Sequence, residues 1–133
     1  LGKGTSPTLH GNTAEDNPFG ILFGKGAGGV AQDNTASGNK RAGIMVLGKG
    51  TSPTLHGNTA EDNPYGIFFV EGAGGLALDN NAKENGAVGI LVTGKGTSPT
   101  LRGNTATDNG NSEIKIGDGA APKVGPNNTG LKE

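Results

Sequence analysis

Three carboxylates, Asp62, Glu84 and Asp108, recur at intervals of 22 and 24 residues. If the chain winds into stacked coils of that length, neighbouring carboxylates would lie ~5 Å apart and the outer two ~10 Å apart, which brackets the separations found in retaining and inverting glycosidases. Acid–base catalysis also requires a cleft that shields such groups from water. Turn carboxylates are solvated, and the same column continues through Asp16 and Gly38, so we predict no catalytic residue.

The remaining motifs do not support metal or phosphate chemistry. His10 and His56 would lie two coils apart, or ~9.6 Å, which is too far to ligate one metal ion directly. A Walker loop has Ser or Thr after its lysine, whereas Gly50 follows Lys49. The GxGxxG spacing that begins at Gly24 has no helix pattern behind it to hold a phosphate. We predict no metal and no cofactor, and we interpret both histidines as solvated turn residues.

An internal repeat organises the whole chain. The 17 residues from Gly2 to Pro18 return letter for letter as Gly48 to Pro64, and their first half returns again from Gly94. Each 46-residue unit contains two similar halves, so the true period is 22 to 24 residues. We predict a single solenoid domain over residues 1–133, with coils at 2–23, 24–47, 48–70, 71–93 and 94–116 and a terminating tail at 117–133.

Two unbroken columns of asparagine run through these units. Asparagine suits a tight bend because its side chain bonds to nearby backbone and tolerates left-handed dihedrals, and stacked copies can also bond to one another. We therefore predict two structural ladders. The first contains Asn12, Asn34, Asn58, Asn80 and Asn104, and the second contains Asn17, Asn39, Asn63, Asn85 and Asn109.

Short apolar runs such as ILF, IMVL, IFFV and ILVT follow the Gly-Ile pairs. Their length and their β-branched and aromatic residues predict buried strands rather than helices. Each coil contains two further short segments of this kind, which gives three strands per coil. Because side chains alternate along a strand, every second residue points inward. The predicted inward columns are Ile21 with Phe23, Ile44 with Val46, Ile67 with Phe69, Ile90 with Val92 and Ile114 with Ile116; Leu9, Ala31, Leu55, Ala77 and Leu101; and Ala14, Ala36, Ala60, Ala82 and Ala106.

Three short strands per coil joined by Gly, Asn and Pro turns are typical of an all-β fold, the parallel β-helix. The pattern sPtL-x-gN-T with Asn and Gly-Ile downstream, alternating with a Gly-Ala-Gly-Gly version, resembles the right-handed parallel β-helix repeats of carbohydrate-binding and sugar-hydrolase proteins. The resemblance runs from Gly2 to about Val124 and implies a right-handed β-solenoid of about five coils. It also implies a glycan partner as an alternative, for which Phe19, Tyr65 and Phe68 are the candidate sugar platforms.

Composition and charge narrow the range of partners. With 27 Gly and 31% apolar residues the chain has too little apolar material for a compact globule, although a stack of coils can use a thin continuous core. The net charge of −1 provides no basic field for nucleic acid or an anionic membrane, and no apolar run reaches the ~18 residues of a membrane span. We predict neither partner. The absence of cysteine leaves the compartment unassigned.

Strand alternation places Leu22, Met45, Phe68 and Leu91 on the outside, one above another. We call these four residues the apolar strip. A contiguous outward apolar surface favours a contact function, so we predict self-association, either as a face-to-face dimer or by end-to-end stacking. Lys115 ends the strip in the last coil, as a guard against further extension. In an alternative interpretation, the side chains of Phe19 and Tyr65 fold over the strip and cover it.

The absence of any unique site favours a non-enzymatic structural or scaffolding protein. The long identical repeats and the uniform Ala of the NTA triplets indicate an engineered or consensus-like protein, or a very recent duplication. A third hypothesis is ice binding through a column of outward threonines. This column contains Thr13, Thr35, Thr59 and Thr105 and is interrupted by Asn81. One threonine per coil is thin support, because a fold and a ladder do not fix a function.

Overall fold

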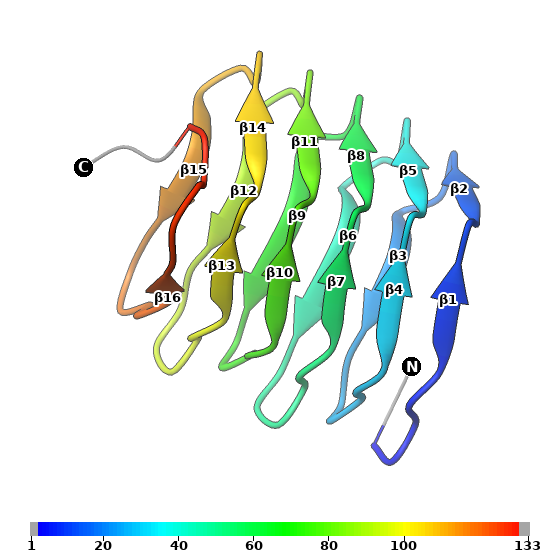
Figure 1. Cartoon of the computed structure of the whole chain (residues 1–133), viewed down its shortest axis with the longest axis vertical. Coiled ribbons are helices and arrows are strands. Elements are labelled where there is room, and N and C mark those ends of the chain that lie inside the picture. Colours follow the sequence, from blue (N-terminus) through cyan, green and yellow to red (C-terminus); the bar gives the residue numbers. More distant parts are fainter. Residues whose placement is uncertain (1–2, 131–133) are drawn as a thin grey trace.

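The computed structural model describes residues 3–130, which form a stack of coils in three parallel sheets (Figure 1). All elements in this part of the chain are strands, and each strand pairs in parallel with its counterpart one coil away. The predicted all-β solenoid of about five coils with three strands per coil is confirmed. The predicted start of the first coil, Gly2, and the last three residues of the predicted tail lie outside the described residues.

The three sheets take successive strands of each coil. Sheet A contains β1 (Thr8–His10), β4 (Val30–Gln32), β7 (Thr54–His56), β10 (Leu76–Leu78), β13 (Thr100–Arg102) and β16 (Lys123–Val124). Sheet B contains β2 (Thr13–Glu15), β5 (Thr35–Ser37), β8 (Thr59–Glu61), β11 (Asn81–Lys83) and β14 (Thr105–Thr107). Sheet C contains β3 (Phe19–Phe23), β6 (Ala42–Leu47), β9 (Tyr65–Val70), β12 (Val88–Val92) and β15 (Ser112–Ile116).

Two residues form the corner between sheets A and B. The turn from sheet B to sheet C begins with a second corner of the same kind. The residue before each ladder asparagine adopts the left-handed conformation, for example Asp33 with φ 55° and Gly57 with φ 67°. The left-handed conformation predicted for the asparagines is therefore wrong by one residue, since it belongs to the residue before each of them. The position before each ladder asparagine is occupied by Gly, Asp, Glu or, before Asn128, by Asn127. The ladder asparagine itself directs its side-chain amide along the stack.

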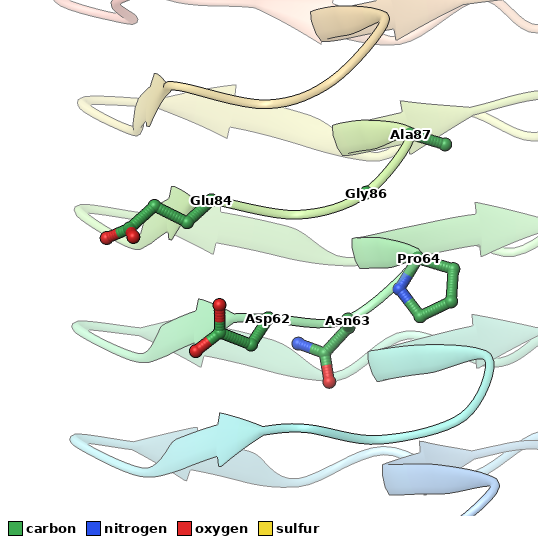
Figure 2. A pocket seen from close by; sticks show the side chains of 6 residues that line it. All are labelled: Asp62, Asn63, Pro64, Glu84, Gly86 and Ala87. Atoms are coloured by element: carbon green, nitrogen blue, oxygen red, sulfur yellow. The ribbon is translucent and has the colours of Figure 1, made fainter.

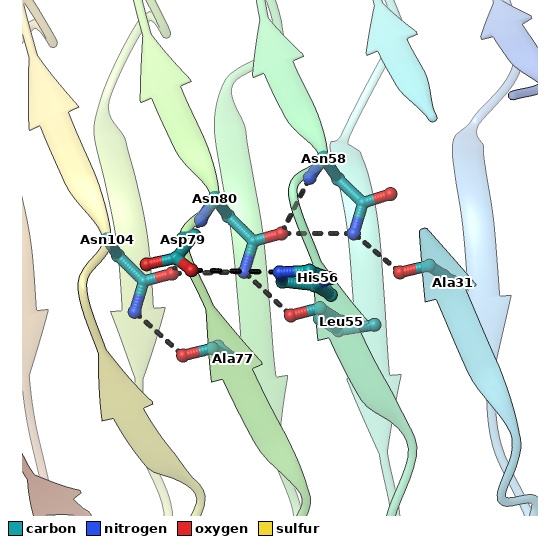
Figure 3. Close-up of polar contacts among 8 residues, drawn as sticks. All are labelled: Ala31, Leu55, His56, Asn58, Ala77, Asp79, Asn80 and Asn104. Atoms are coloured by element: carbon teal, nitrogen blue, oxygen red, sulfur yellow. Dashed lines mark hydrogen bonds and ion pairs between the residues drawn. The ribbon is translucent and has the colours of Figure 1, made fainter. Parts of the chain in front are cut away.

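The asparagine ladders are confirmed, and Asn58 illustrates a complete rung (Figure 3). Its Nδ2 donates to Asn80 Oδ1 at 3.0 Å and to the Ala31 carbonyl at 2.9 Å, and its backbone N–H donates to the same Oδ1 at 2.9 Å. Its own Oδ1 accepts from the N–H and Nδ2 of Asn34. Asn58 is fully buried, so each of these bonds satisfies a group that water cannot reach.

The C-terminal tail continues the stack, although the sequence analysis treated it only as a terminator. Asn128 adds a rung to the first ladder, because its Oδ1 accepts from the N–H and Nδ2 of Asn104. In the second ladder Glu113 takes the place of a further asparagine: its Oε1 accepts from the N–H of Asn109 at 3.0 Å and from Nδ2 at 2.8 Å. A carboxylate thus completes the last rung of the second ladder.

Glu113 can do this because it stands at the Gly position of the Gly-Ile pairs. In earlier coils this position has no room for a side chain: a Cβ on Gly43 would lie 2.7 Å from Asn63 Nδ2 and 2.9 Å from the Gly66 carbonyl. No further asparagine follows Asn109 in this column, so the Glu113 side chain occupies the space that the next rung would fill.

Two columns of the core alternate between larger and smaller side chains from coil to coil, whereas the isoleucine column of sheet C and the alanine column of sheet B are uniform. Leu55 and Phe69 fill one coil, whereas Ala77 and Val92 fill the next, and all four are fully buried. Such alternation lets neighbouring layers interdigitate. The predicted inward columns are confirmed through the middle of the stack, but Ile116 is wrong: it is 40% exposed at the end of the edge strand β15. Ile114 in the same strand is buried, and its N–H donates to the Gly130 carbonyl of the tail.

Replacing Asn58 with Ala is expected to destabilise the protein by about 1 to 3 kcal/mol. The change leaves the amide groups of Asn34 and the carbonyl of Ala31 without their buried partners. His56→Ala, in the same coil but half-exposed, is the control and should cost much less. Chemical denaturation measures both, and equal losses would contradict the structural assignment of the ladder.

Replacing Glu113 with Gln should preserve the last rung, because a Gln carbonyl oxygen can accept the same two hydrogen bonds. Glu113→Ala should lower the free energy of unfolding by about 0.5 to 1.5 kcal/mol. Urea melts of the two variants test the capping role. If Gln is as damaging as Ala, the oxygen acceptor is not what stabilises this end.

Candidate functional site

The acidic column lies at the corner between sheets B and C. Asp62 and Glu84 are exposed and left-handed, with φ of 57° and 54°, and Asp108 repeats this arrangement one coil later. Figure 2 shows the carboxylates of Asp62 and Glu84 on one side of an open hollow of about 430 Å³, with Pro64 on the other side. The position before a ladder asparagine requires a residue that tolerates this backbone, which accounts for these acids structurally.

The two histidines lie at strand ends and not in turns, which corrects the sequence interpretation. His10 Nε2 lies 3.4 Å from Asp33 Oδ2, and His56 Nε2 lies 3.6 Å from Asp79 Oδ2 in the next coil (Figure 3). All four side chains remain 41% to 68% exposed, so these pairs are screened and contribute little to stability. Their aspartates are the left-handed corner residues.

The Walker-like segment before Lys49 and the GxGxxG spacing from Gly24 both lie where, within the described part of the chain, no helix follows to hold a phosphate. The segment before Lys49 is the buried strand β6, and the glycines after Gly24 form the turn between β3 and β4. Among residues 3–130, no three His, Cys, Asp or Glu side chains gather where they could hold a metal ion. The same residues contain no helix with the length and apolar character needed to cross a membrane.

The apolar strip occupies the outer face of sheet C. Register pairs link Leu22 to Met45, Met45 to Phe68 and Phe68 to Leu91, and Lys115 follows Leu91. Leu22 is 37% exposed, and the other three members are half-buried. Leu47 and Val70 pair beside the strip and are also half-buried, which widens the apolar face.

An aromatic hollow of about 210 Å³ opens beside the strip, where β3, β6 and β9 begin. The ring centroids of Tyr65 and Phe68 lie 5.3 Å apart with their planes tilted by 43°, a favourable aromatic arrangement. Tyr65 therefore covers part of Phe68, as the alternative interpretation of the strip proposed, but it leaves Leu22 exposed. The lining residues are Phe19, Lys40, Arg41, Ala42, Met45, Pro64, Tyr65 and Phe68.

Lys40 and Arg41 line this hollow but were not predicted from the sequence. They were detectable as a change of charge between equivalent positions: Asn85 has the same spacing to its Gly-Ile pair as Asn39, but Gly86 and Ala87 follow it in place of the two cations. A column-by-column comparison notes this difference, but it does not show that the cations reach the aromatic residues of adjacent coils.

The threonine column considered for ice binding lies on sheet B, with Asn81 between Thr59 and Thr105 in register. The neighbouring outward column is mixed and includes an ion pair of 3.7 Å between Lys83 and Glu61. Sheet B thus presents one threonine column beside charged residues.

Because Asp62 occupies a left-handed corner, Asp62→Gly is expected to change the free energy of unfolding by no more than about 0.5 kcal/mol. Asp62→Val should cost at least about 1 kcal/mol, since a β-branched residue is poorly tolerated there. Glu61→Val, at the end of the adjacent strand β8, is the matched control and should be well tolerated. A glycine variant as unstable as the valine variant at position 62, measured by urea denaturation, would contradict the turn role.

Comparisons with known proteins agree with this architecture. The family described as "Right handed beta helix region" matches residues 1–106 of the chain. A search of curated proteins gave no match, and a search of solved structures also gave none. The family match covers most of the chain and includes all the coils that carry the strip and the aromatic hollow. The chain belongs to the right-handed β-helix family.

Proposed function

We propose that this chain is a non-enzymatic scaffold whose sheet C associates reversibly with sheet C of a second copy. The supporting observation is the apolar character of that face. Sheet B presents Thr, Ser, Glu and Lys, and sheet A mixes Thr, His, Gln and Arg with a few aliphatic residues. On sheet C, by contrast, the strip and the adjoining Leu47 and Val70 form a continuous apolar surface across four coils.

The order of residues along the strip makes it self-complementary. From the first coil to the fourth it reads Leu22, Met45, Phe68, Leu91. A two-fold axis that runs parallel to the strands, between the second and third coils, would place Leu22 of one copy against Leu91 of the other. The same axis sets Met45 against Phe68, a favourable sulfur–aromatic contact. An isologous interface of this kind closes after two copies. Lys115 would then lie beyond the edge of the pair, in water.

The size of the face predicts weak association. Four coils at ~4.8 Å and about five residues at ~3.3 Å give a contact of roughly 300 Å² per copy. Stable complexes bury about 800 Å² per partner, so this interface should be reversible, with a dissociation constant on the order of 0.1 to 1 mM. A rigid scaffold that carries a low-affinity contact face suits assembly at high local concentration.

A non-catalytic role is supported by the placement of the acidic residues. The carboxylates of the corner column are exposed and serve left-handed turns, which leaves them without the desolvation that tunes a catalytic acid. The net charge of −1 disfavours nucleic acid or an anionic membrane as the partner.

The unbroken identity of residues 2–18 with residues 48–64 supports a consensus-like or engineered origin, or a recent duplication. Each 46-residue unit pairs a coil rich in large core residues with a coil of small ones, as Leu55 and Ala77 illustrate. Identical units therefore stack on one another without any adjustment of the core. Such a chain can be lengthened by whole units, which is a useful property for a scaffold.

Phe68→Lys should abolish association, because two-fold symmetry places the new charge against Met45 twice in each dimer. Loss of two apolar contacts weakens association by about a hundredfold or more. Light scattering over a concentration series measures the mass of each variant. Thr59→Lys introduces the same charged side chain on sheet B and should leave association intact.

Two results would overturn the proposal. One is a wild-type protein that remains monomeric at millimolar concentration. The other is growth of open filaments that Phe68→Lys does not affect, since that would indicate end-to-end stacking through the edge strands β1, β2 and β3. Circular dichroism of both lysine variants confirms that the coils remain folded.

A further inference from the structure

The aromatic hollow differs from every other part of the surface in combining rings and unpaired cations. Phe19, Tyr65 and Phe68 are three of only five aromatic residues in the chain, and all three line it. The remaining two, Phe23 and Phe69, are fully buried in the core. All the aromatic surface outside the core is therefore collected at one place.

The size of the hollow sets the size of its ligand. Its volume is about 210 Å³, whereas drug-sized ligands occupy pockets of about 300 to 1,000 Å³. An apolar cavity of about 150 Å³ is sufficient for a benzene ring. The hollow therefore fits one ring with a short substituent.

The rim of the hollow is cationic. Lys40 and Arg41 are exposed, and within residues 3–130 neither forms an ion pair. Their backbone is fixed, since the N–H of Lys40 donates to the Asn17 carbonyl and that of Arg41 donates to the Pro18 carbonyl. An anion on the substituent of a bound ring would meet two cations carried on an ordered turn.

The polar groups of the lining discriminate between possible anions. The side-chain polar groups are the two cations, which only donate, and the Tyr65 hydroxyl. No Asp, Glu, Asn, Gln, Ser or Thr lines the hollow. A uronic acid would satisfy the cations, but it would leave most of its hydroxyl protons without a side-chain acceptor. A flat apolar ring has no such requirement.

We infer that this hollow binds a small aromatic carboxylate, with its ring between Tyr65, Phe68 and Phe19 and its carboxylate toward Lys40 and Arg41. The equivalent corner two coils later carries Gly86 and Ala87 in place of the two cations. The hollow there has no cation and no aromatic residue among its lining residues. We therefore expect a single site per chain, at the corner where Lys40 and Arg41 follow the ladder asparagine.

The test uses the wild-type chain at a concentration where light scattering shows it to be monomeric, so that its outcome is independent of self-association. Tyr65 is the sole tyrosine, so its ring resonances report occupancy of the hollow without ambiguity. We expect 3-phenylpropionate to shift them with a dissociation constant on the order of 1 mM, which is typical of a ligand of this size. Neutral 3-phenylpropanol should bind less tightly, and galacturonate should not bind.

Arg41→Gln should weaken binding of 3-phenylpropionate about threefold to tenfold and leave binding of 3-phenylpropanol unchanged. Lys95→Gln removes the same charge from an exposed turn away from the hollow and should change neither affinity. Equal affinities for the acid and the alcohol would overturn the role of the cations. Shifts with galacturonate instead would overturn the aromatic ligand in favour of a sugar, and no shift with either aromatic probe would remove the site altogether.

Discussion

The stacking of buried asparagine amides at the spacing of one coil is the constraint on which the rest of this structure depends. Each amide both donates to and accepts from its neighbours, as Asn58 does with Asn34 and Asn80. A slip of one residue between coils would leave these groups buried and unpaired, at a cost of about 1 to 3 kcal/mol each. The ladders therefore fix the register between coils. This register stacks each of the remaining side chains on the equivalent residue of the next coil.

Strict stacking also explains why the sequence repeats over two coils and not one. The isoleucine column is uniform from coil to coil, but the column that contains Leu55 alternates: Leu55 lies between Ala31 and Ala77, so a large residue always stacks on small ones. The turn from sheet C to sheet A follows the same rule: a Cβ on Gly75 would clash with Pro53 of the preceding coil. The chemical unit of this β-helix is thus a pair of complementary coils.

The sequence was sufficient to predict what depends on the columns themselves, namely the strands, both ladders and the central core. It was insufficient where a residue acts outside its column. Glu113 occupies a glycine position but reaches back to Asn109, and Asp33 occupies a corner but contacts His10 of the preceding coil. Ile116 follows the inward pattern and is nevertheless exposed at the end of the edge strand β15, although Ile114 in the same strand is buried. Each case depends on neighbours in three dimensions that alignment of repeats does not supply.

The same constraints indicate where this fold can acquire function. Core positions must remain apolar and match the size of their neighbours, ladder positions must remain asparagine, and each residue before a ladder asparagine must tolerate a left-handed backbone. The outer face of sheet C and the residues after the second ladder are free of these demands. They are also among the places where the units differ: Leu22 becomes Phe68, and the pair Lys40 and Arg41 has no charged counterpart in the later coils. In a chain whose repetition serves stability, the departures from repetition are the positions at which recognition can be built without weakening the stack.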